Sequence, residues 1–260
     1  MPEPFIIDIH THIHQHDPTE VPAMLQRAAQ AGVRLVLTAG VTVESSRTCV
    51  EMAHTYPNVL ACVGLHPMDM KEPLSQTDYA ALEEMARDPR VVAISETGLD
   101  NPDKSGPDHR WQEDSFRRHI RLARTVGKPV IFHNREAGFE PLRILREERA
   151  EEAGVVCHYF QGTEEYARAC LDHGIYLSLS KLLLRVPELQ EVVRWAPLDR
   201  LVLETDAYPQ PFKRRRKQWT EPRDAALVAA KLAELKGITV EEAVRATWEN
   251  AVRVLRLGET

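Results

Sequence analysis

The residues best suited to chemistry begin near the amino end of the chain, where His10 and His12 stand two positions apart. They follow an apolar run typical of a strand, on which side chains two positions apart point to the same side. Asp8, His10 and His12 are therefore predicted to share one face, with Ile7 and Ile9 on the other, and in a barrel the three polar side chains would lie inside. Paired imidazoles at this spacing can converge on one cation. An isolated pair is more often two hydrogen-bonded histidines in a loop, so its interpretation depends on the rest of the chain.

Ligand-type residues also stand at the ends of four other apolar runs. They are Glu96, His133, His158 and Asp206. In a parallel barrel the carboxyl ends of the strands meet at one mouth, so these side chains are expected to join His10 and His12 there. Six ligands exceed the roughly three protein groups that a single tetrahedral catalytic ion uses. The pattern therefore predicts two divalent ions, which can be Mg²⁺, Mn²⁺ or Zn²⁺.

Glu96 and Asp206 are the predicted catalytic carboxylates. A carboxylate such as Glu96 can bridge two ions about 3.5–4 Å apart, with a water activated between them as the nucleophile. Asp206 can ligate one ion and also accept a proton from the attacking water. Because bound water near a divalent ion is acidified, no serine or cysteine nucleophile is required.

Two further side chains at strand ends, His66 and Arg135, are predicted to bind substrate by contacting a phosphate. Arginine suits this role because its guanidinium makes paired hydrogen bonds to phosphate oxygens. For His66, a hydrogen bond that supports a ligand is an equally favoured interpretation.

A basic run, Lys213 to Lys217, is followed by Trp219 in the segment after the eighth apolar run. Five cations beside an aromatic ring can hold phosphates and stack a base. A solvated charge run is the alternative, and the two interpretations stay open. For Lys181, which follows the seventh run, a plain surface role is favoured.

Eight short apolar runs must position these residues, and each has the character of a parallel strand buried on both faces. They are Phe5–Ile9, Arg34–Ala39, Val59–Gly64, Val91–Ser95, Pro129–Phe132, Gly154–Cys157, Ile175–Leu179 and Leu201–Glu204. Segments with helical spacing separate the runs, and Thr239 followed by Glu241 and Glu242 predicts the start of a last helix. The alternation favours a single α/β domain, residues 1–260, folded as a (β/α)8 barrel. No Gly-x-Gly-x-x-Gly follows the first run, which argues against a dinucleotide-binding fold.

The bulk composition sets limits on partners and location. A net charge of −6 argues against a protein coated in nucleic acid, although a local basic patch is compatible with it. No apolar run approaches the roughly 20 residues that span a bilayer, so no membrane partner is expected. The amino end has no signal-peptide pattern, and the four cysteines form no paired motif. Buried thiols in the cytoplasm are therefore expected, and the oligomeric state stays open.

Six short motifs, in order along the chain, resemble those of the TatD family of metal-dependent DNases, within the amidohydrolase superfamily. The motifs are Asp8-Ile9-His10-Thr11-His12, Gly64-Leu65-His66-Pro67, Glu96-Thr97-Gly98-Leu99-Asp100, His133-Asn134-Arg135-Glu136-Ala137, His158-Tyr159-Phe160-Gln161-Gly162 and Glu204-Thr205-Asp206. The resemblance implies exonuclease-like hydrolysis of single-stranded DNA or a related phosphodiester, with magnesium or manganese as the usual ions. It also implies one ion held by His10, His12, Glu96 and Asp206, and a second by Glu96, His133 and His158.

Three departures from the family pattern lie in the predicted mouth loops. An aromatic residue often follows Gly-Leu-Asp in the family, whereas this chain has Asn101-Pro102. One residue is inserted in Asp206-Ala207-Tyr208-Pro209, and Thr220 replaces a common Asn before Glu221-Pro222. The departures leave the ligand set intact and bear on the substrate.

Two rival functions are compatible with the same residues. One is an amidohydrolase-superfamily enzyme that cleaves an amide, a lactone or another ester, and several of those bridge their ions through a carboxylated lysine on the fourth strand. Glu96 at that place favours the DNase-like branch. The other rival is a non-catalytic barrel whose metals stabilise a binding module, and the complete ligand set argues against it.

Overall fold

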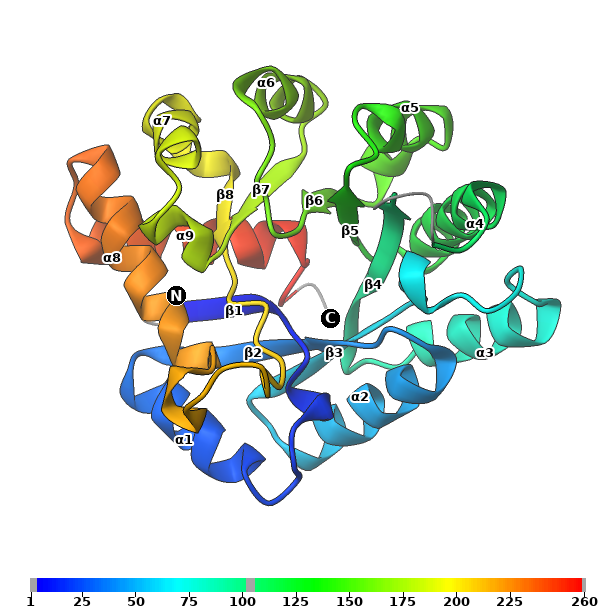
Figure 1. Cartoon of the computed structure of the whole chain (residues 1–260), viewed down its shortest axis with the longest axis horizontal. Helices are drawn as coiled ribbons and strands as arrows, with labels where there is room; N and C mark the ends of the chain where they lie inside the picture. The colour runs from blue at the N-terminus through cyan, green and yellow to red at the C-terminus, as the bar shows by residue number, and fades with distance from the viewer. Residues whose placement is uncertain (1–3, 102–105, 259–260) are drawn as a thin grey trace.

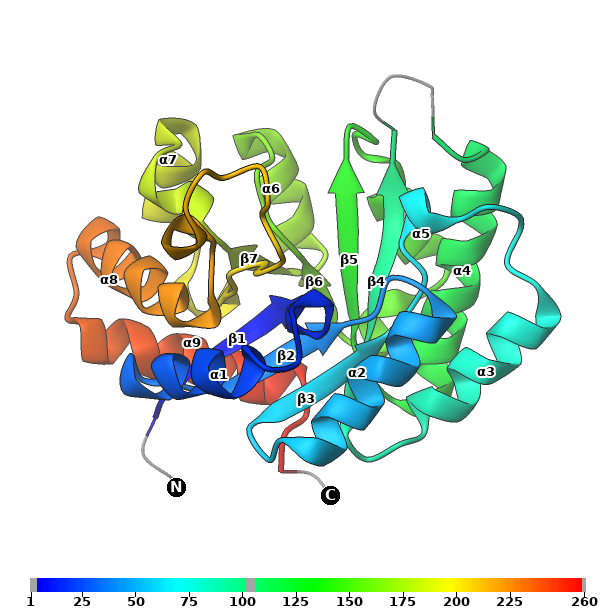
Figure 2. The same cartoon turned by 60° about the horizontal axis from the view of Figure 1, so that its bottom comes forward.

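Eight parallel strands form the barrel, in the order β1 to β8, and the computed structural model describes residues 4–101 and 106–258. Figure 1 looks into the barrel, and Figure 2 shows β4 and β5 running upward toward the loops at one end. The strands are β1 (Ile6–Thr11), β2 (Val33–Ala39), β3 (Val59–Val63), β4 (Val91–Asp100), β5 (Val130–Arg135), β6 (Val155–Cys157), β7 (Tyr176–Leu179) and β8 (Leu201–Leu203). The predicted (β/α)8 barrel is confirmed.

Helices α1 to α7 connect successive strands around the outside of the barrel, and α8 and α9 follow the last strand (Figure 1). They are α1 (Val21–Gln30), α2 (Val43–Thr55), α3 (Gln76–Ala86), α4 (His109–Val126), α5 (Glu140–Glu147), α6 (Glu164–Asp172), α7 (Pro187–Trp195), α8 (Ala225–Lys236) and α9 (Val240–Val254). The predicted start of α9 is confirmed. Thr239 accepts the Glu242 N–H at 3.1 Å, and Glu242 accepts the Thr239 N–H at 2.8 Å, which satisfies two free donors of the first turn.

Two hydrophobic clusters lie on the two faces of the sheet. The inner cluster takes one set of alternating strand residues and is closed at the bottom by α9 through Trp248 and Ala251. The outer cluster joins the other set to the helices. Inner-cluster members from the eight strands include Ile7, Ile9, Leu37, Leu60, Ala93, Ile131, Val156, Tyr176 and Val202. Burial on both faces explains why the strands are nearly continuous apolar runs.

The first strand differs from the predicted alternation. Ile7 and Ile9 belong to the inner cluster, whereas the Asp8 carboxylate accepts the Thr205 N–H at 2.9 Å and the Thr205 hydroxyl at 2.5 Å. A register shift between Asp8 and Thr11 explains the difference, because it changes which side chains face inward beyond it. His10 reaches the mouth through this irregularity, and Asp8 does not accompany it.

The fourth and fifth strands run further than their apolar residues predict. β4 continues to Asp100 and β5 to Arg135, and the extensions pair with each other, with Gly98 opposite His133. A register shift between Ile94 and Thr97 stands at the start of the β4 extension, beside Glu96. Glu96 and His133 therefore lie within strands and are held by sheet hydrogen bonds, rather than in loops.

The barrel closes between its first and last strands at the mouth end. An isolated parallel bridge joins Thr11 to Ala207, the His12 N–H donates to the Ala207 carbonyl at 2.7 Å, and the Asp206 N–H donates to the His10 carbonyl at 3.0 Å. The two backbone segments that close the barrel therefore both carry predicted ligands, with His10 and His12 on the first and Asp206 on the second.

The four cysteines are free and buried, as the sequence predicts. Among the helices of residues 4–101 and 106–258, none is long and apolar enough to cross a membrane.

Candidate metal centre

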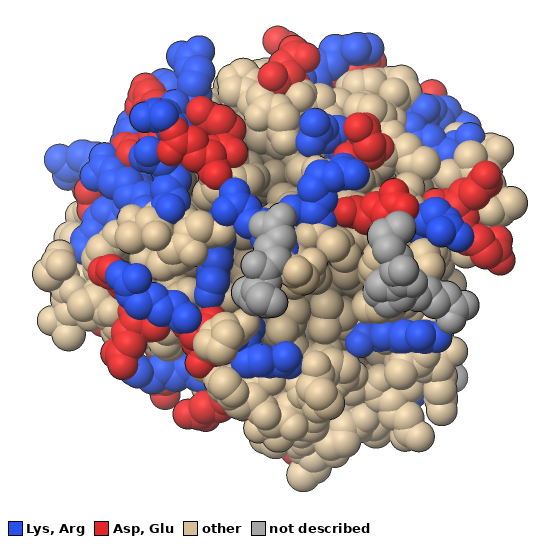
Figure 3. Space-filling view, turned by 180° about the vertical axis from the view of Figure 1, so that it is seen from behind, with Lys and Arg blue, Asp and Glu red and all other residues tan. Residues whose placement is uncertain are grey.

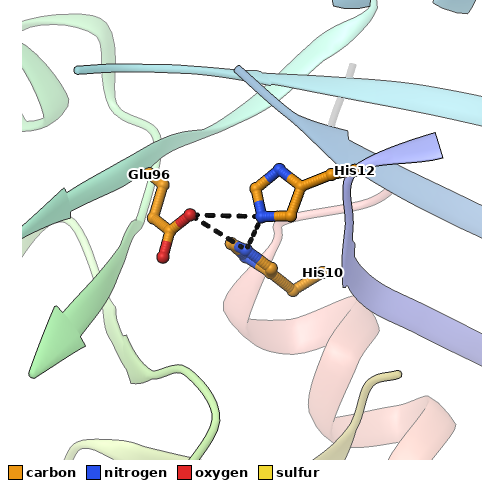
Figure 4. Close-up of side chains that lie close together, drawn as sticks. All are labelled: His10, His12 and Glu96. Carbon is orange, nitrogen blue, oxygen red and sulfur yellow. Dashed lines mark hydrogen bonds and ion pairs between the residues drawn. The ribbon is translucent and has the colours of Figure 1, made fainter. Parts of the chain in front are cut away.

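Glu96 lies at the centre of the ligand-type side chains at the barrel mouth. Its Oε2 atom lies 3.6 Å from His10 Nε2 and 3.2 Å from His12 Nε2, and Figure 4 shows both rings turned toward this oxygen. Its Oε1 atom lies 3.0 Å from His133 Nδ1 and 3.1 Å from His158 Nε2. Oε2 therefore faces two histidines from the end of β1, whereas Oε1 faces two others from the ends of β5 and β6, with His66 Nε2 also 3.6 Å from Oε1.

Asp206 completes the group on the side of His12. Its Oδ1 atom lies 3.4 Å from His12 Nε2, and its backbone has a φ of 50°. The Asp206 side chain is 19% exposed and that of Glu96 is 5% exposed. Asp206 is therefore more accessible from the cavity over the centre than Glu96 is.

Contacts on the far side of two imidazole rings, His12 and His133, determine which nitrogen faces the centre, and His158 has a carboxylate on its far side. His12 Nδ1 donates to the Ala39 carbonyl at 2.9 Å, and His133 Nε2 donates to Asp100 Oδ2 at 3.0 Å. His158 Nδ1 lies 3.3 Å from Glu204 Oε1. A carbonyl or carboxylate only accepts, so His12 Nδ1 and His133 Nε2 carry the hydrogen, and the opposite nitrogen of each neutral ring presents its lone pair to the centre. This is the orientation that a metal-ligating histidine requires. His158 Nδ1 makes no aligned hydrogen bond to Glu204 among the described residues.

The donor set fits divalent cations on two observations. His133 Nδ1 is buried and makes no aligned hydrogen bond, although it lies beside Glu96. His10 Nε2 and His12 Nε2 face each other at 3.3 Å, so they have at most one hydrogen to share between them. Unpaired buried nitrogen atoms are costly unless a cation accepts their lone pairs. Two of the groups whose candidate ligand atoms lie within 4.8 Å of one another share Glu96: one is His10, His12 and Glu96, and the other is Glu96, His133 and His158.

The electrostatics of the centre also favour positive charge. Burial by itself lowers the pKa of His12, but the carboxylates of Asp206 and Glu96 outweigh burial and raise this pKa to about 10. Burial raises the pKa of Glu96, yet the charges of His66 and His158 and the hydrogen bonds of His10 and His12 hold it well below its usual range. A field that attracts protons to a buried histidine also attracts a metal ion.

Two carboxylates that were not predicted as site residues contact the candidate histidine ligands. Asp100 is buried at the end of β4, where it accepts from His133 through one oxygen and from Arg135 Nε through the other, at 2.7 Å. Glu204 is fully buried and accepts the Tyr159 N–H at 2.7 Å and the Ser178 hydroxyl at 2.5 Å, beside His158. Their signal was present in the sequence, because both are carboxylates within the motifs that carry ligands.

The predicted substrate residues lie around a cavity of about 410 Å³ over the centre. His66 Nε2 lies 3.6 Å from Glu96 Oε1, and the His66 and His133 ring centroids are 4.7 Å apart. Arg135 has its Nε bound to Asp100, while 47% of its side chain is exposed. The structure thus brings all eight predicted site residues to the barrel mouth.

The departures from the family pattern also lie near the mouth. Tyr208 lines the cavity over the centre, and Thr220 lines a neighbouring cavity, where its N–H donates to Gln210 Oε1 at 2.9 Å. The Asn101 N–H donates to the Arg135 carbonyl at 3.0 Å, and Pro102 lies outside the described residues.

A parallel (β/α)8 barrel with histidines and carboxylates gathered at its mouth defines the class of metal-dependent hydrolases. The family within that class follows from comparison with known proteins. The model of the TatD related DNase family matches residues 7–256, and the chain belongs to this family.

Relatives and solved structures agree with this membership. The chain is 36% identical over 261 residues, covering 97% of this chain and 100% of the other, to the "Uncharacterized metal-dependent hydrolase YabD" of Bacillus subtilis strain 168. It is 33% identical to the "3'-5' ssDNA/RNA exonuclease TatD" of Citrobacter koseri, over 82% of this chain and 84% of the other. The crystal structure of the TatD homologue YjjV from Escherichia coli K12 superposes with a TM-score of 0.87 at 29% identity, covering 97% of this chain and 98% of that one.

Proposed function

We propose that the protein hydrolyses phosphodiester bonds of single-stranded nucleic acid with two divalent ions. His10, His12, Glu96 and Asp206 hold one ion, and Glu96, His133 and His158 hold the other. The observation that carries the proposal is the division of the Glu96 carboxylate, with one histidine pair at Oε2 and another at Oε1. A carboxylate placed between two sets of imidazoles suits a bridging ligand.

Bound divalent ions supply an acidified water and polarise the phosphoryl oxygens of the substrate. The residues of the chain do the rest. Asp206, exposed to the cavity, accepts the proton of the attacking water. Arg135 is oriented through its Nε by Asp100, and its outer nitrogens, which have no partner among residues 4–101 and 106–258, bind a phosphate, while His66 contacts the same phosphate from the β3 side.

The nucleic acid substrate is supported by the relative named as a 3'-5' ssDNA/RNA exonuclease. The ions are Mg²⁺, Mn²⁺ or Zn²⁺, because mixed imidazole and carboxylate sets accept all three according to availability. The cytoplasm stays the predicted location.

The test is degradation of an end-labelled single-stranded oligonucleotide by the purified protein, with added Mn²⁺ or with a chelator, together with metal analysis. We expect cleavage only with the ion, and a loss of at least about 100-fold in kcat for Asp206→Asn, because proton acceptors contribute about 10²–10⁴-fold. Asp199→Asn is the matched control, because it removes the same negative charge at an exposed position, and it should keep activity. If the metal-loaded protein leaves DNA and small phosphodiesters intact but cleaves a lactone or an amide, the substrate assignment is wrong.

A further inference from the structure

A second cavity, of about 360 Å³, lies beside the metal centre on the side of β7 and β8. Its walls come from the 3-10 turn after β7, Lys181–Leu184, and from the segment that follows β8. Tyr159, Asp206 and Tyr208 line both this cavity and the one over the centre. A chain lying across the mouth can therefore occupy both.

Three cations line this second cavity, which we call the cationic cavity: Lys181, Arg185 and Lys213. Lys181 Nζ pairs with Asp224 at 2.7 Å, and Lys213 Nζ donates to the Gln218 carbonyl at 3.2 Å. Within residues 4–101 and 106–258, Arg185 is exposed and has no ion pair. Partial burial, followed by repulsion from Lys181 and Arg185, lowers the pKa of Lys213. The cations are thus close enough to repel, and a bound anion relieves this repulsion.

Aromatic rings accompany these cations. Phe212 lines the cationic cavity and is 70% exposed, an unusual position for a large apolar side chain. Tyr159 and Tyr208 stand between this cavity and the centre. Cations beside exposed rings suit a single-stranded polynucleotide, in which phosphates and unstacked bases alternate.

The basic run after β8 does not act as a unit. Arg216 pairs with Glu20 at 2.6 Å and Glu221 at 3.2 Å, and covers the Trp219 ring at 4.6 Å. Of the run's described side chains, only Lys213 lines the cationic cavity, and the side chain of Lys217 lies outside the described part. Lys181, for which the sequence favoured a plain surface role, is on the cavity wall instead.

Another cavity, of about 530 Å³, lies at the ends of β5 and β6 and shares Tyr159 with the cationic cavity, but the rest of its lining is different. Arg135 is its one cation among the described residues, and the Nε of Arg135 is bound to Asp100. The distribution of charge across the mouth is therefore asymmetric, and it favours the β7–β8 side for a strand of phosphates.

We propose that the cationic cavity binds the part of a single-stranded polynucleotide next to the scissile bond. Lys181, Arg185 and Lys213 contact its phosphates, and Phe212 stacks on a base. The inference rests on the proposed phosphodiesterase function and adds to it a site that small phosphodiesters do not fill.

The test compares Arg185→Ala, Lys213→Ala and Phe212→Ala with the wild type, all loaded with Mn²⁺. Binding of a fluorescent ten-nucleotide phosphorothioate oligothymidine is measured by anisotropy at several salt concentrations. We expect each variant to bind about fivefold more weakly, and each cation variant to lower the salt slope by about 0.7, the value for one phosphate contact on a single strand. The ratio of kcat/KM for oligothymidine to that for bis(4-nitrophenyl) phosphate should fall by a similar factor.

Arg34→Ala and Leu227→Ala are the matched controls, because they remove an exposed charge at the start of β2 and an exposed apolar side chain on α8. Both should keep wild-type binding and the wild-type ratio. Wild-type affinity and salt slope in all three test variants would overturn the cavity assignment while the proposed function stands. A wild-type protein that cleaves neither oligonucleotide nor small phosphodiester would instead overturn the proposed function, and the inference with it.

Discussion

Asp100 shows how one buried carboxylate can act on two functional side chains at the mouth. One of its oxygens accepts from His133 Nε2 and the other from Arg135 Nε. Partners of this kind orient a ligating imidazole and raise its basicity. Asp100 is therefore a positioning residue for both a candidate ligand and a candidate phosphate contact.

We expect Asp100→Asn to weaken metal binding by about 10–100-fold, because the neutral amide holds the His133 N–H less strongly. Titration of the metal-free protein with Mn²⁺, followed by calorimetry, measures this effect independently of catalysis. Asp199→Asn serves again as the charge-matched control. Metal affinity equal to that of the wild type would show that Asp100 has no positioning role.

At the scale of residues, the candidate ligands could be predicted from the sequence, but the carboxylates that contact the ligand rings could not. His10, His12, Glu96 and Asp206 were predictable because strand ends converge in a barrel. Asp100 and Glu204 were not assigned, because a supporting carboxylate is recognised by the ring it touches, and that contact depends on the neighbouring strand. The same limit applied to Lys181, whose place on a cavity wall depends on the segment after β8.

At the scale of elements, the β4 and β5 extensions depend on a close approach at Gly98. This residue has a φ of 141°, and a Cβ built on it would lie 2.1 Å from the His133 carbonyl oxygen. The strand pair that holds Glu96 and His133 therefore has no room for a side chain at this position.

Gly98→Ala should lower the free energy of unfolding by about 2–5 kcal/mol, from overpacking and backbone strain together. It should also displace His133 and reduce metal affinity. Gly127→Ala is the matched comparison, because Gly127 has a φ of 69° at the end of α4 but no neighbour closer than 3.6 Å. That variant should lose about 1 kcal/mol and keep its metal affinity. Equal losses in both, measured by urea unfolding and calorimetry, would rule out the close-approach explanation.

His119 on α4 makes the stability of the protein sensitive to acid. Its Nδ1 donates to the Ser115 carbonyl at 2.7 Å, its Nε2 is buried with no partner among the described residues, and burial lowers its pKa to about 4. The ordinary histidine pKa of about 6.5 applies in the unfolded chain, which therefore takes up the proton first as the pH falls. Its contribution is complete above pH 6.5 and is lost progressively toward pH 4.

The free energy of unfolding falls as the pH is lowered from 7.5 to 4.5. We expect this fall to be about 2–3 kcal/mol smaller in His119→Gln than in the wild type. Glutamine keeps a donor for Ser115 and has no titratable group. His173→Gln is the control, because His173 makes the same ring-to-carbonyl contact with Ala169, at 2.9 Å, on an exposed surface. Chemical unfolding at several pH values gives both results, and identical acid losses in wild type and His119→Gln would contradict the prediction.

The presence and order of the strands and helices were largely predictable from the sequence, but the residues at which they end were not. Continuous apolar runs locate all eight strands, because both faces of a parallel sheet are buried. Asp100 and Arg135 end β4 and β5 beyond those runs, because two polar extensions stabilise each other by pairing. The face assignment on β1 was wrong because alternation assumes a regular strand, and the register shift after Asp8 breaks it.

At the scale of the whole molecule, charge is distributed differently at the two ends of the barrel. Figure 3 shows the end opposite the mouth, where the basic side chains at the upper left are interleaved with acidic ones. On α4, Arg117 illustrates such pairing, with contacts to Glu113, Glu147 and Glu148. Surface pairs of this kind cancel at a distance, so this mixed region offers a polyanion little net attraction.

The metal centre should also stabilise the whole barrel, since its candidate ligands come from β1, β4, β5, β6 and the segment after β8. Mn²⁺ at 100 times its dissociation constant should add about 2.7 kcal/mol for one site. For a domain of this size the expected rise in Tm is about 5–10 °C, measured by scanning calorimetry and reversed by a chelator. Glu96→Gln is the control variant and should show little of this rise. An unchanged Tm in metal-loaded wild type would contradict a site built across the strands.

The closure of the barrel has a consequence for biosynthesis. His10 emerges from the ribosome early, whereas Asp206 and the Ala207 bridge to Thr11 follow almost two hundred residues later. Domains fold as the chain is synthesised. The edge of the first strand therefore stays uncovered, and the candidate ligand set stays incomplete, until the eighth strand and Asp206 have been synthesised. A ribosome-bound or truncated chain that ends before Asp206 thus lacks one of the candidate ligands, and we expect it to have no metal-dependent hydrolytic activity.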